Sequence, residues 1–310
     1  MLSGQTQGSH LVVVTIDFLA AAFLAAIFAG FLGALFGIGG GMIIVPFLTA
    51  FLGIPIHEAI AISIVSVIAT SNAGGSSYVE QRITNIQLAM FLEVATTAGA
   101  LVGSFIALLL QSWQLFLIFV VLLVYVAFTS FKTRRADETR IASGDFAKTR
   151  QDRLAKYLNL RGTYFDAKEK KDVPYAVTGA PLGSLISSLA GVVSGLLGVG
   201  GGIIKVAAMN MFMNVPMKAA VGTSKFMIGV TAATGALLFF LAGLVDPYVI
   251  APVALGTTLG ATVGTWVMPR VRSSALKAAF GVLVIYLAYT MLAQGLALGF
   301  NIHLPLGGSG

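Results

Sequence analysis

Long stretches of apolar residues constrain this fold more than any other feature. Eight windows are apolar over about 20 residues, which is enough for a helix to cross the roughly 30 Å hydrocarbon core of a bilayer. They cover residues 11–36, 57–79, 85–110, 113–131, 175–197, 218–242, 246–269 and 276–299. Only 10% of the 310 residues are charged and 57% are hydrophobic, whereas a soluble domain carries about 25% charged residues. We therefore predict an all-α polytopic membrane protein.

The excess positive charge lies in one polar stretch between two apolar halves. Residues 132–172 hold 12 Lys/Arg and 7 Asp/Glu, a balance of +5, whereas all other residues hold 7 and 5, a balance of +2. A basic total can indicate nucleic-acid binding, but this position favours a loop kept in the cytoplasm by its charge. We therefore expect a first repeat (1–131), a charged cytoplasmic linker (132–174) and a second repeat (175–310). The linker has too few apolar residues to form a domain, although a short surface helix is expected at about residues 150–158.

The two apolar halves are copies of one another. A shift of 161 residues aligns residues 30–128 with residues 191–289 without a gap, and 27 of the 99 pairs are identical. Shared apolar composition alone gives roughly one identity in ten pairs. The aligned segments include two glycine runs, Gly37-Ile-Gly-Gly-Gly41 and Gly198-Val-Gly-Gly-Gly202. The chain is therefore an internal duplication.

A shorter apolar element opens with each glycine run, over residues 37–54 and 198–215. If this element crosses the membrane, each half crosses five times, and the odd number inverts the second half relative to the first. The basic residues at 218 and 270–277 then lie on the side of the linker and Asp246 lies on the other side, as the positive-inside rule requires. If the element is re-entrant, each half crosses four times and residues 270–277 lie outside. We predict two inverted repeats of about five membrane helices each, with glycine-broken helices at the repeat interface.

The glycine runs are also the first candidate binding groups. Three successive glycines cost about 3 kcal/mol of helix propensity relative to alanine, and they leave backbone amides free at the start of the next helix. Glycine-interrupted segments at matching positions of two halves point to the binding site of a transporter, and helix N-termini favour anions. The alternative is that both runs are tight turns without a ligand. The candidate amides belong to Gly39, Gly40, Gly41, Gly200, Gly201 and Gly202.

Two lysines within the second half are further candidates, because a charge at bilayer depth costs several kcal/mol unless it faces protein or water. Lys205 follows the glycine run by three residues, and Lys225 lies in the next window. Their first-half counterparts are Ile44 and Ile64, so the repeat scaffold does not need a charge at either position. Two cations near two helix starts indicate a site for an oxyanion. The alternative is that the lysines extend to the headgroups.

Glu93 is the acidic candidate, and its repeat counterpart is Ala254. Two roles are open: it carries a coupling proton, or it neutralises a lysine in a structural pair. Hydroxyl and amide groups near the glycine runs are expected to bind the ligand, although such groups also bond to backbone carbonyls within helices. The leading candidates are Ser63, Asn72, Thr223 and Ser224, with Thr70, Ser71, Asn210 and Asn214 near them.

No enzyme or metal motif is present in the sequence. His57 and Glu58 begin a helix but lack the second histidine of a zinc helix, and the glycine runs lack the Gly-Lys-Ser/Thr ending of a phosphate loop. We expect no metal, no cofactor and no nucleic-acid partner.

The duplicated pattern G-[IV]-G-G-G, followed by an apolar run, a proline and A-x-x-x-S, resembles the sulfite exporter TauE/SafE family, also called the TSUP permeases. The segments GALFGIGGGMIIVPFLTAFLGIPIHEAIAIS and SGLLGVGGGIIKVAAMNMFMNVPMKAAVGTS carry the resemblance, which extends over roughly residues 15–300. It implies a multi-pass inner-membrane carrier of sulfur-containing anions such as sulfite, sulfonates or sulfoacetate, often an exporter driven by an ion gradient. The copies differ where Pro46 stands opposite Ala207.

Together, these features predict a secondary active transporter, in the exporting direction, of small sulfur-containing oxyanions by alternating access. The substrate would lie between the two glycine-broken helices, and its partners would be the small anion and the lipid bilayer; the sequence does not predict an oligomeric state. A passive anion channel that uses the same site is the alternative. The lack of a nucleophile, a base and a metal group argues against a membrane-embedded enzyme.

Overall fold

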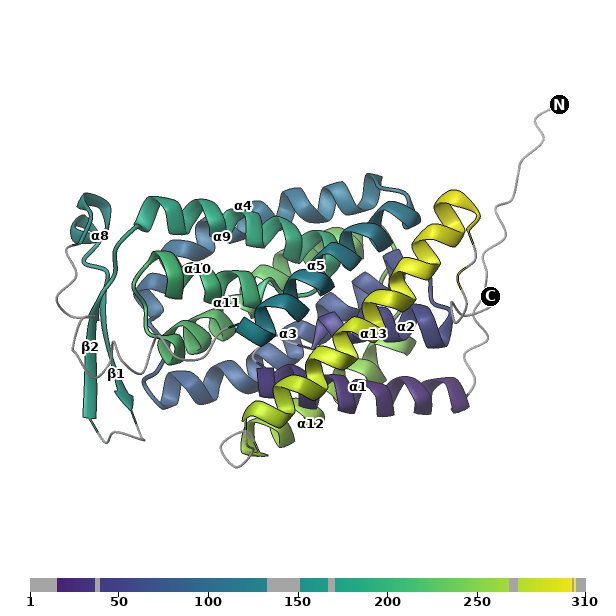
Figure 1. Cartoon of the computed structure of the whole chain (residues 1–310), viewed down its shortest axis with the longest axis horizontal. Helices are drawn as coiled ribbons and strands as arrows, with labels where there is room; N and C mark the ends of the chain where they lie inside the picture. Colours follow the sequence, from purple (N-terminus) through teal and green to yellow (C-terminus); the bar gives the residue numbers. More distant parts are fainter. Residues whose placement is uncertain are drawn as a thin grey trace.

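The computed structural model describes residues 16–36, 40–132, 151–166, 171–267, 273–302 and 304. Within these residues the chain is a bundle of helices with a two-stranded sheet at one end (Figure 1). The first half contains α1 (Ile16–Phe36), α2 (Gly41–Leu52), α3 (Ile56–Glu80), α4 (Ile86–Leu109) and α5 (Ser112–Lys132). The second half contains α9 (Ala180–Leu197), α10 (Gly202–Phe212), α11 (Met217–Leu241), α12 (Pro247–Val267) and α13 (Ser273–Phe300). Between the halves lie α8 (Arg153–Tyr157), β1 (Arg161–Asp166) and β2 (Lys171–Ala176).

The helices confirm the prediction of an all-α polytopic membrane protein. Seven helices of the described part, α1, α3, α4, α9, α11, α12 and α13, are long and apolar enough to cross a bilayer. Large apolar side chains such as Val94, Leu109 and Tyr248 are mostly exposed, as expected for a surface in contact with lipid. The two helices after the glycine runs are shorter. With 12 residues in α2 and 11 in α10, each extends about 17 Å, roughly half of the bilayer core.

The short helix α10 folds back along α9. The amide of Thr178, just before α9, donates a hydrogen bond of 3.2 Å to the carbonyl of Met213, just after α10. The start of α9 and the end of α10 therefore lie at the same end of the molecule, and the glycine run is the tip of a helical hairpin in the interior. If the glycine-led element crosses the membrane, Lys218 is expected on the side of the linker. The fold-back of α10 agrees with this for the second repeat, because α10 ends near the start of α9 and Lys218 follows it.

Each close crossing between a first-half helix and a second-half helix has a counterpart in which the two halves exchange roles. A side chain at Gly30 would overlap the carbonyl oxygen of Thr257, and a side chain at Gly191 would overlap that of Thr96. Each of these pairs maps onto the other by the shift of 161 residues. The same relation joins two further crossings, Gly260 with Ile27 and Gly99 with Ser188. Glycine thus lets α1 pack against α12, and α4 against α9, backbone to backbone. A two-fold relation between the duplicated halves would produce this exchange, whereas their inversion across the membrane remains a prediction.

The linker contains the expected short helix, α8, and a β-hairpin that the sequence did not predict. Strands β1 and β2 pair antiparallel, and they lie with α8 at one end of the bundle (Figure 1). Tyr164 and Tyr175 of the hairpin are buried in a cluster that includes Leu88 and Met213 of the bundle. The hairpin therefore covers apolar surface of the helices, which explains how a segment with few apolar residues becomes ordered. The expected domain boundary at residue 174 lies inside β2.

Asn85 links this hairpin to α4 and α11 by hydrogen bonds. Its side-chain amide donates to the carbonyl of Arg161 and to the hydroxyl of Tyr175, both at 3.1 Å. Its carbonyl oxygen caps α4 at Leu88, and its backbone amide donates to the Thr223 hydroxyl of α11 at 3.0 Å. Burial raises the pKa of Tyr175 to about 12, against a smaller lowering by the Asn85 bond, so the phenol is neutral at pH 7.

Candidate functional site

Both glycine runs interrupt the helical backbone, as predicted. Helix α1 ends at Phe36 before α2 begins, and α9 ends at Leu197 before α10 begins. The φ angle is +80° at Gly40 and +67°, +78° and +63° at Gly198, Gly200 and Gly201. Side-chain-bearing residues rarely adopt this left-handed region, so these turns require glycine. Gly39 lies outside the described residues.

The two glycine breaks meet each other at the boundary between the halves. A Cβ at Gly41, where α2 begins, would overlap the carbonyl oxygen of Gly198 at the end of α9. The hydroxyl of Ser63 on α3 donates a 2.8 Å hydrogen bond to the same carbonyl. We refer to the contact among these three residues as the glycine junction. It joins the first half to the second by a backbone contact that leaves no room for a side chain.

Free amides begin both short helices. The earliest helical hydrogen bonds run from Ile43 to Gly40 in α2 and from Lys205 to Gly201 in α10, at 3.0 and 3.1 Å. The amides before them have no helical acceptor, and neither helix has a side-chain cap. One positive helix-dipole end therefore lies in the glycine junction and a second begins four residues after Gly198, a setting that favours an anion.

Lys205 lies in a hydrogen-bonded chain that ends at Glu93. Lys205 is 0% exposed, and its Nζ donates to the hydroxyl of Thr231 at 2.6 Å. Thr231 in turn lies 2.7 Å from Oε1 of Glu93, to which it donates. The hydroxyls of Thr96 and Thr97 also donate to the Glu93 carboxylate, at 3.1 and 3.3 Å. Helices α4, α10 and α11 thus bring one buried cation and one buried carboxylate into a single network, which we call the Lys205–Glu93 network.

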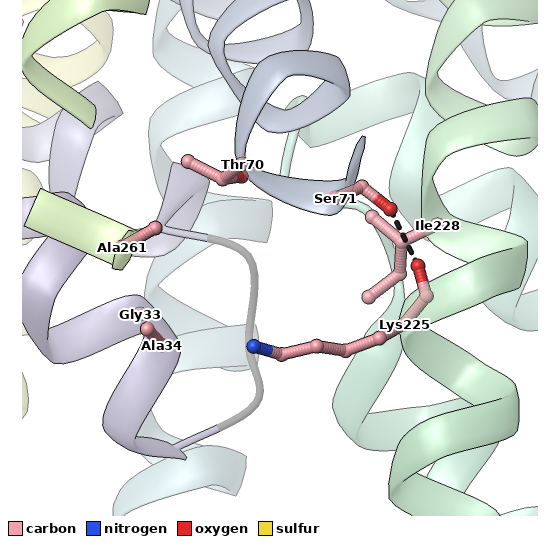
Figure 2. Close-up of a pocket in the computed structure, with 7 residues that line it drawn as sticks. All are labelled: Gly33, Ala34, Thr70, Ser71, Lys225, Ile228 and Ala261. Atoms are coloured by element: carbon pink, nitrogen blue, oxygen red, sulfur yellow. Dashed lines mark hydrogen bonds between the residues drawn. The ribbon is translucent and has the colours of Figure 1, made fainter. Parts of the chain in front are cut away.

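Lys225 has different surroundings, because it lines a small pocket. The pocket is lined by Gly33, Ala34, Thr70, Ser71, Lys225, Ile228 and Ala261. Figure 2 shows the Lys225 side chain extending from α11 across the pocket toward Gly33 and Ala34 of α1. The residue is only 4% exposed, and none of the described lining residues is acidic. Within the part of the chain that the structure describes, the ammonium has no carboxylate partner; its Nζ lies 5.4 Å from the centre of the Tyr78 ring.

The position that corresponds to Lys225 in the first half is filled by an apolar side chain. Lys225 packs on Gly74, where a Cβ would lie 3.0 Å from Nζ. Ile64, its repeat counterpart, packs on Gly235 in the same way, with Cδ1 2.5 Å from where a Cβ would lie. Both contacts use the same part of the duplicated scaffold, but only the second half places a charge there.

Most of the predicted hydroxyl and amide ligands bind the protein itself. Ser63 and Ser224 donate to the carbonyls of Gly198 and Gly202, at 2.8 and 3.2 Å. Thr223 accepts the Asn85 amide, and Asn72 is exposed. The side-chain amides of Asn210 and Asn214 donate to the carbonyls of Val215 and Ala176. Of the eight predicted groups, Thr70 and Ser71 line the pocket, and their hydroxyls also donate to the backbone carbonyls of Val67 and Lys225.

Sequence reasoning did not select Thr231, which connects Lys205 to Glu93. The one available signal was that threonine occurs at this position in both repeats, as Thr70 and Thr231. The small residues that leave space in the pocket, Gly33, Ala34 and Ala261, had no signal that separates them from ordinary helix-packing residues.

Comparison with known proteins gives three findings. The family model described as "Sulfite exporter TauE/SafE" matches residues 22–291. Two relatives from Bacillus subtilis strain 168 align over most of the chain. Probable membrane transporter protein YunE is 23% identical over 275 residues, which cover 86% of this chain and 95% of YunE. Probable membrane transporter protein YdhB is 27% identical over 263 residues, which cover 80% of this chain and 89% of YdhB. No solved structure matches the chain.

Proposed function

Since the chain belongs to the sulfite exporter TauE/SafE family of membrane transporters, we propose that it carries small sulfur-containing oxyanions across the membrane by secondary active transport. Sulfite or an organosulfonate is the leading substrate class. One observation carries this proposal: the buried ammonium of Lys225 faces a pocket and has no acidic residue among the described lining. Membership in a transporter family also confirms that the chain is not an enzyme.

The pocket supplies groups that suit an oxyanion. The ammonium of Lys225 offers three hydrogen-bond donors, and charge-assisted bonds of this kind are roughly twice as strong as neutral ones. The hydroxyl-bearing residues Thr70 and Ser71 line the same space (Figure 2). The amides of the glycine breaks, at Gly40, Gly41 and Gly200–Gly202, add positive dipole ends at the boundary between the halves.

The Lys205–Glu93 network supports a coupled mechanism. Thr231 carries one hydroxyl hydrogen, and two acceptors are within reach: Glu93 at 2.7 Å and the carbonyl of Met227 at 3.0 Å. Glu93 is the candidate coupling residue, because its carboxylate is the described countercharge of Lys205 and connects α4 of the first half to α10 and α11 of the second. Rocking of the two halves around the glycine junction would expose the anion to each side in turn, with export as the expected direction at the inner membrane.

Transport by purified protein in liposomes tests this proposal. We expect sulfite to accumulate against its gradient when a pH step is imposed. Lys225→Gln should reduce sulfite affinity by about ten- to a hundredfold, because it removes a charged hydrogen bond worth about 1.5–3 kcal/mol. Lys218→Gln is the matched control, since Lys218 is exposed at the linker end of α11.

Two results would contradict the proposal. Undiminished sulfite affinity in Lys225→Gln would exclude the pocket as the binding site. Flux that only runs down the sulfite gradient and ignores the pH step would indicate the passive anion channel instead.

A further inference from the structure

The charged groups buried within the described helices sum to one positive charge. They are Lys205, Lys225 and Glu93, which are 0%, 4% and 7% exposed. Two ammonium groups and one carboxylate leave a balance of +1. Charges in a low-dielectric interior interact strongly, and an uncompensated one is costly. The bound state with the lowest electrostatic cost is therefore the one in which the ligand brings a single negative charge.

We infer that the protein selects its substrate by charge state: while Glu93 is ionised, the substrate is a small monoanion, such as hydrogen sulfite or a monosulfonate, and dianions are disfavoured. This inference rests on the proposed function, and it narrows the substrate class of the same site. A dianion would need a second positive charge, which becomes available when Glu93 is neutral.

The surroundings of Glu93 suit an ionised carboxylate. The described partners of its carboxylate are the hydroxyls of Thr96, Thr97 and Thr231, and each of them is within donating distance of it. An ionised carboxylate accepts hydrogen bonds only, so it suits three donors. Lys205 donates a hydrogen bond to Thr231, and the Thr231 hydroxyl can donate one to Glu93. This arrangement matches an ammonium at one end and a carboxylate at the other.

The network is close enough to the pocket to influence the ligand. Lys225 and Thr231 lie on the same helix six residues apart, which is about 9 Å along the axis. Thr231 bonds to Glu93, so we take a distance of about 10 Å between that carboxylate and an anion beside Lys225. At the effective dielectric constant of about 20 that suits proteins, a charge at this distance changes the binding of another on the order of tenfold. Glu93 therefore opposes a monoanion about tenfold and a dianion about a hundredfold relative to a neutral residue at the same place.

Methanesulfonate and sulfate provide a matched pair of probes, since they are tetrahedral oxyanions of similar size that carry one and two negative charges. The measurement is the affinity of purified protein for each anion at pH 7. Wild-type protein should prefer methanesulfonate. Glu93→Gln should shift the ratio of affinities toward sulfate on the order of tenfold. Glu58→Gln is the control glutamate, because Glu58 begins α3 outside the Lys205–Glu93 network, and it should leave the ratio unchanged.

A double variant separates charge from damage to the structure. Lys205→Gln combined with Glu93→Gln restores the balance of +1, so it should restore the wild-type preference for methanesulfonate. An unchanged ratio in Glu93→Gln, or a double variant that keeps the shifted ratio, would overturn the inference while leaving the proposed function in place. Wild-type protein that binds neither anion, with no effect of Lys225→Gln on sulfite, would instead overturn the proposed function.

Discussion

At the scale of single residues, two lysines that look alike in the sequence have different surroundings in the structure. Lys205 and Lys225 both replace isoleucine of the first repeat, and both were predicted to bind the anion. Lys205 donates to Thr231 and is balanced by Glu93, whereas Lys225 faces the pocket. Sequence position could not separate them, because the difference depends on which helix of the opposite half lies beside each side chain.

Thr231 forms hydrogen bonds with both Lys205 and Glu93. Thr231→Val removes the hydroxyl but keeps the shape, so the buried ammonium of Lys205 loses the hydroxyl to which it donates, at a cost of about 1–3 kcal/mol or more. We expect a clearly lower melting temperature for the detergent-solubilised variant. Thr234→Val is the control on the same helix, since the half-buried Thr234 donates to the carbonyl of Val230 in its own helix and is outside the Lys205–Glu93 network. Equal melting temperatures for both variants would show that the network does not stabilise the fold.

At the scale of elements, hydrophobic windows predicted the long helices to within a few residues. The window at 57–79 became α3 (Ile56–Glu80), and the window at 218–242 became α11 (Met217–Leu241). The hairpin β1–β2 could not be predicted in this way, because its buried face packs on surface supplied by the helices and not on a core of its own.

The close contact at the glycine junction predicts the effect of a substitution at Gly41, where α2 begins. Gly41→Ala places a Cβ against the backbone carbonyl of Gly198 and 2.7 Å from Oγ of Ser63. Because backbone cannot move as freely as a side chain, we expect a loss of about 1–3 kcal/mol, together with weakened transport. Gly75→Ala is the matched control, since its nearest neighbours would lie 3.7 Å away. Similar melting temperatures in the two variants would contradict the close contact of the two halves.

At the scale of the whole molecule, the linker elements mark one end of the bundle (Figure 1). Arg153 and Arg161 belong to these elements, whereas Glu58 and Asp246 interact electrostatically with each other. The repeat and its charges were readable from the sequence. The exchange of partners between the halves was not, because it depends on helix crossings that only the folded chain brings together.

The membrane side on which each end of a helix lies can be measured by cysteine labelling. The chain contains no cysteine, so a single introduced cysteine can be labelled without background. The two inverted repeats predict that Lys218→Cys and Arg153→Cys react with a membrane-impermeant thiol reagent from the cytoplasmic side only. Asp246→Cys should react from the opposite side only. Labelling of Asp246→Cys and Lys218→Cys from the same side would contradict the predicted crossing of α11.

The central claim is that the buried ammonium of Lys225 holds the transported anion. A high-resolution cryo-EM map of the protein with methanesulfonate tests it most directly. We expect density for the anion in the pocket beside Thr70 and Ser71, with an oxygen about 2.8 Å from Nζ of Lys225. An empty pocket at saturating methanesulfonate, or anion density beside Lys205 with Lys225 directed to the lipid headgroups, would contradict it.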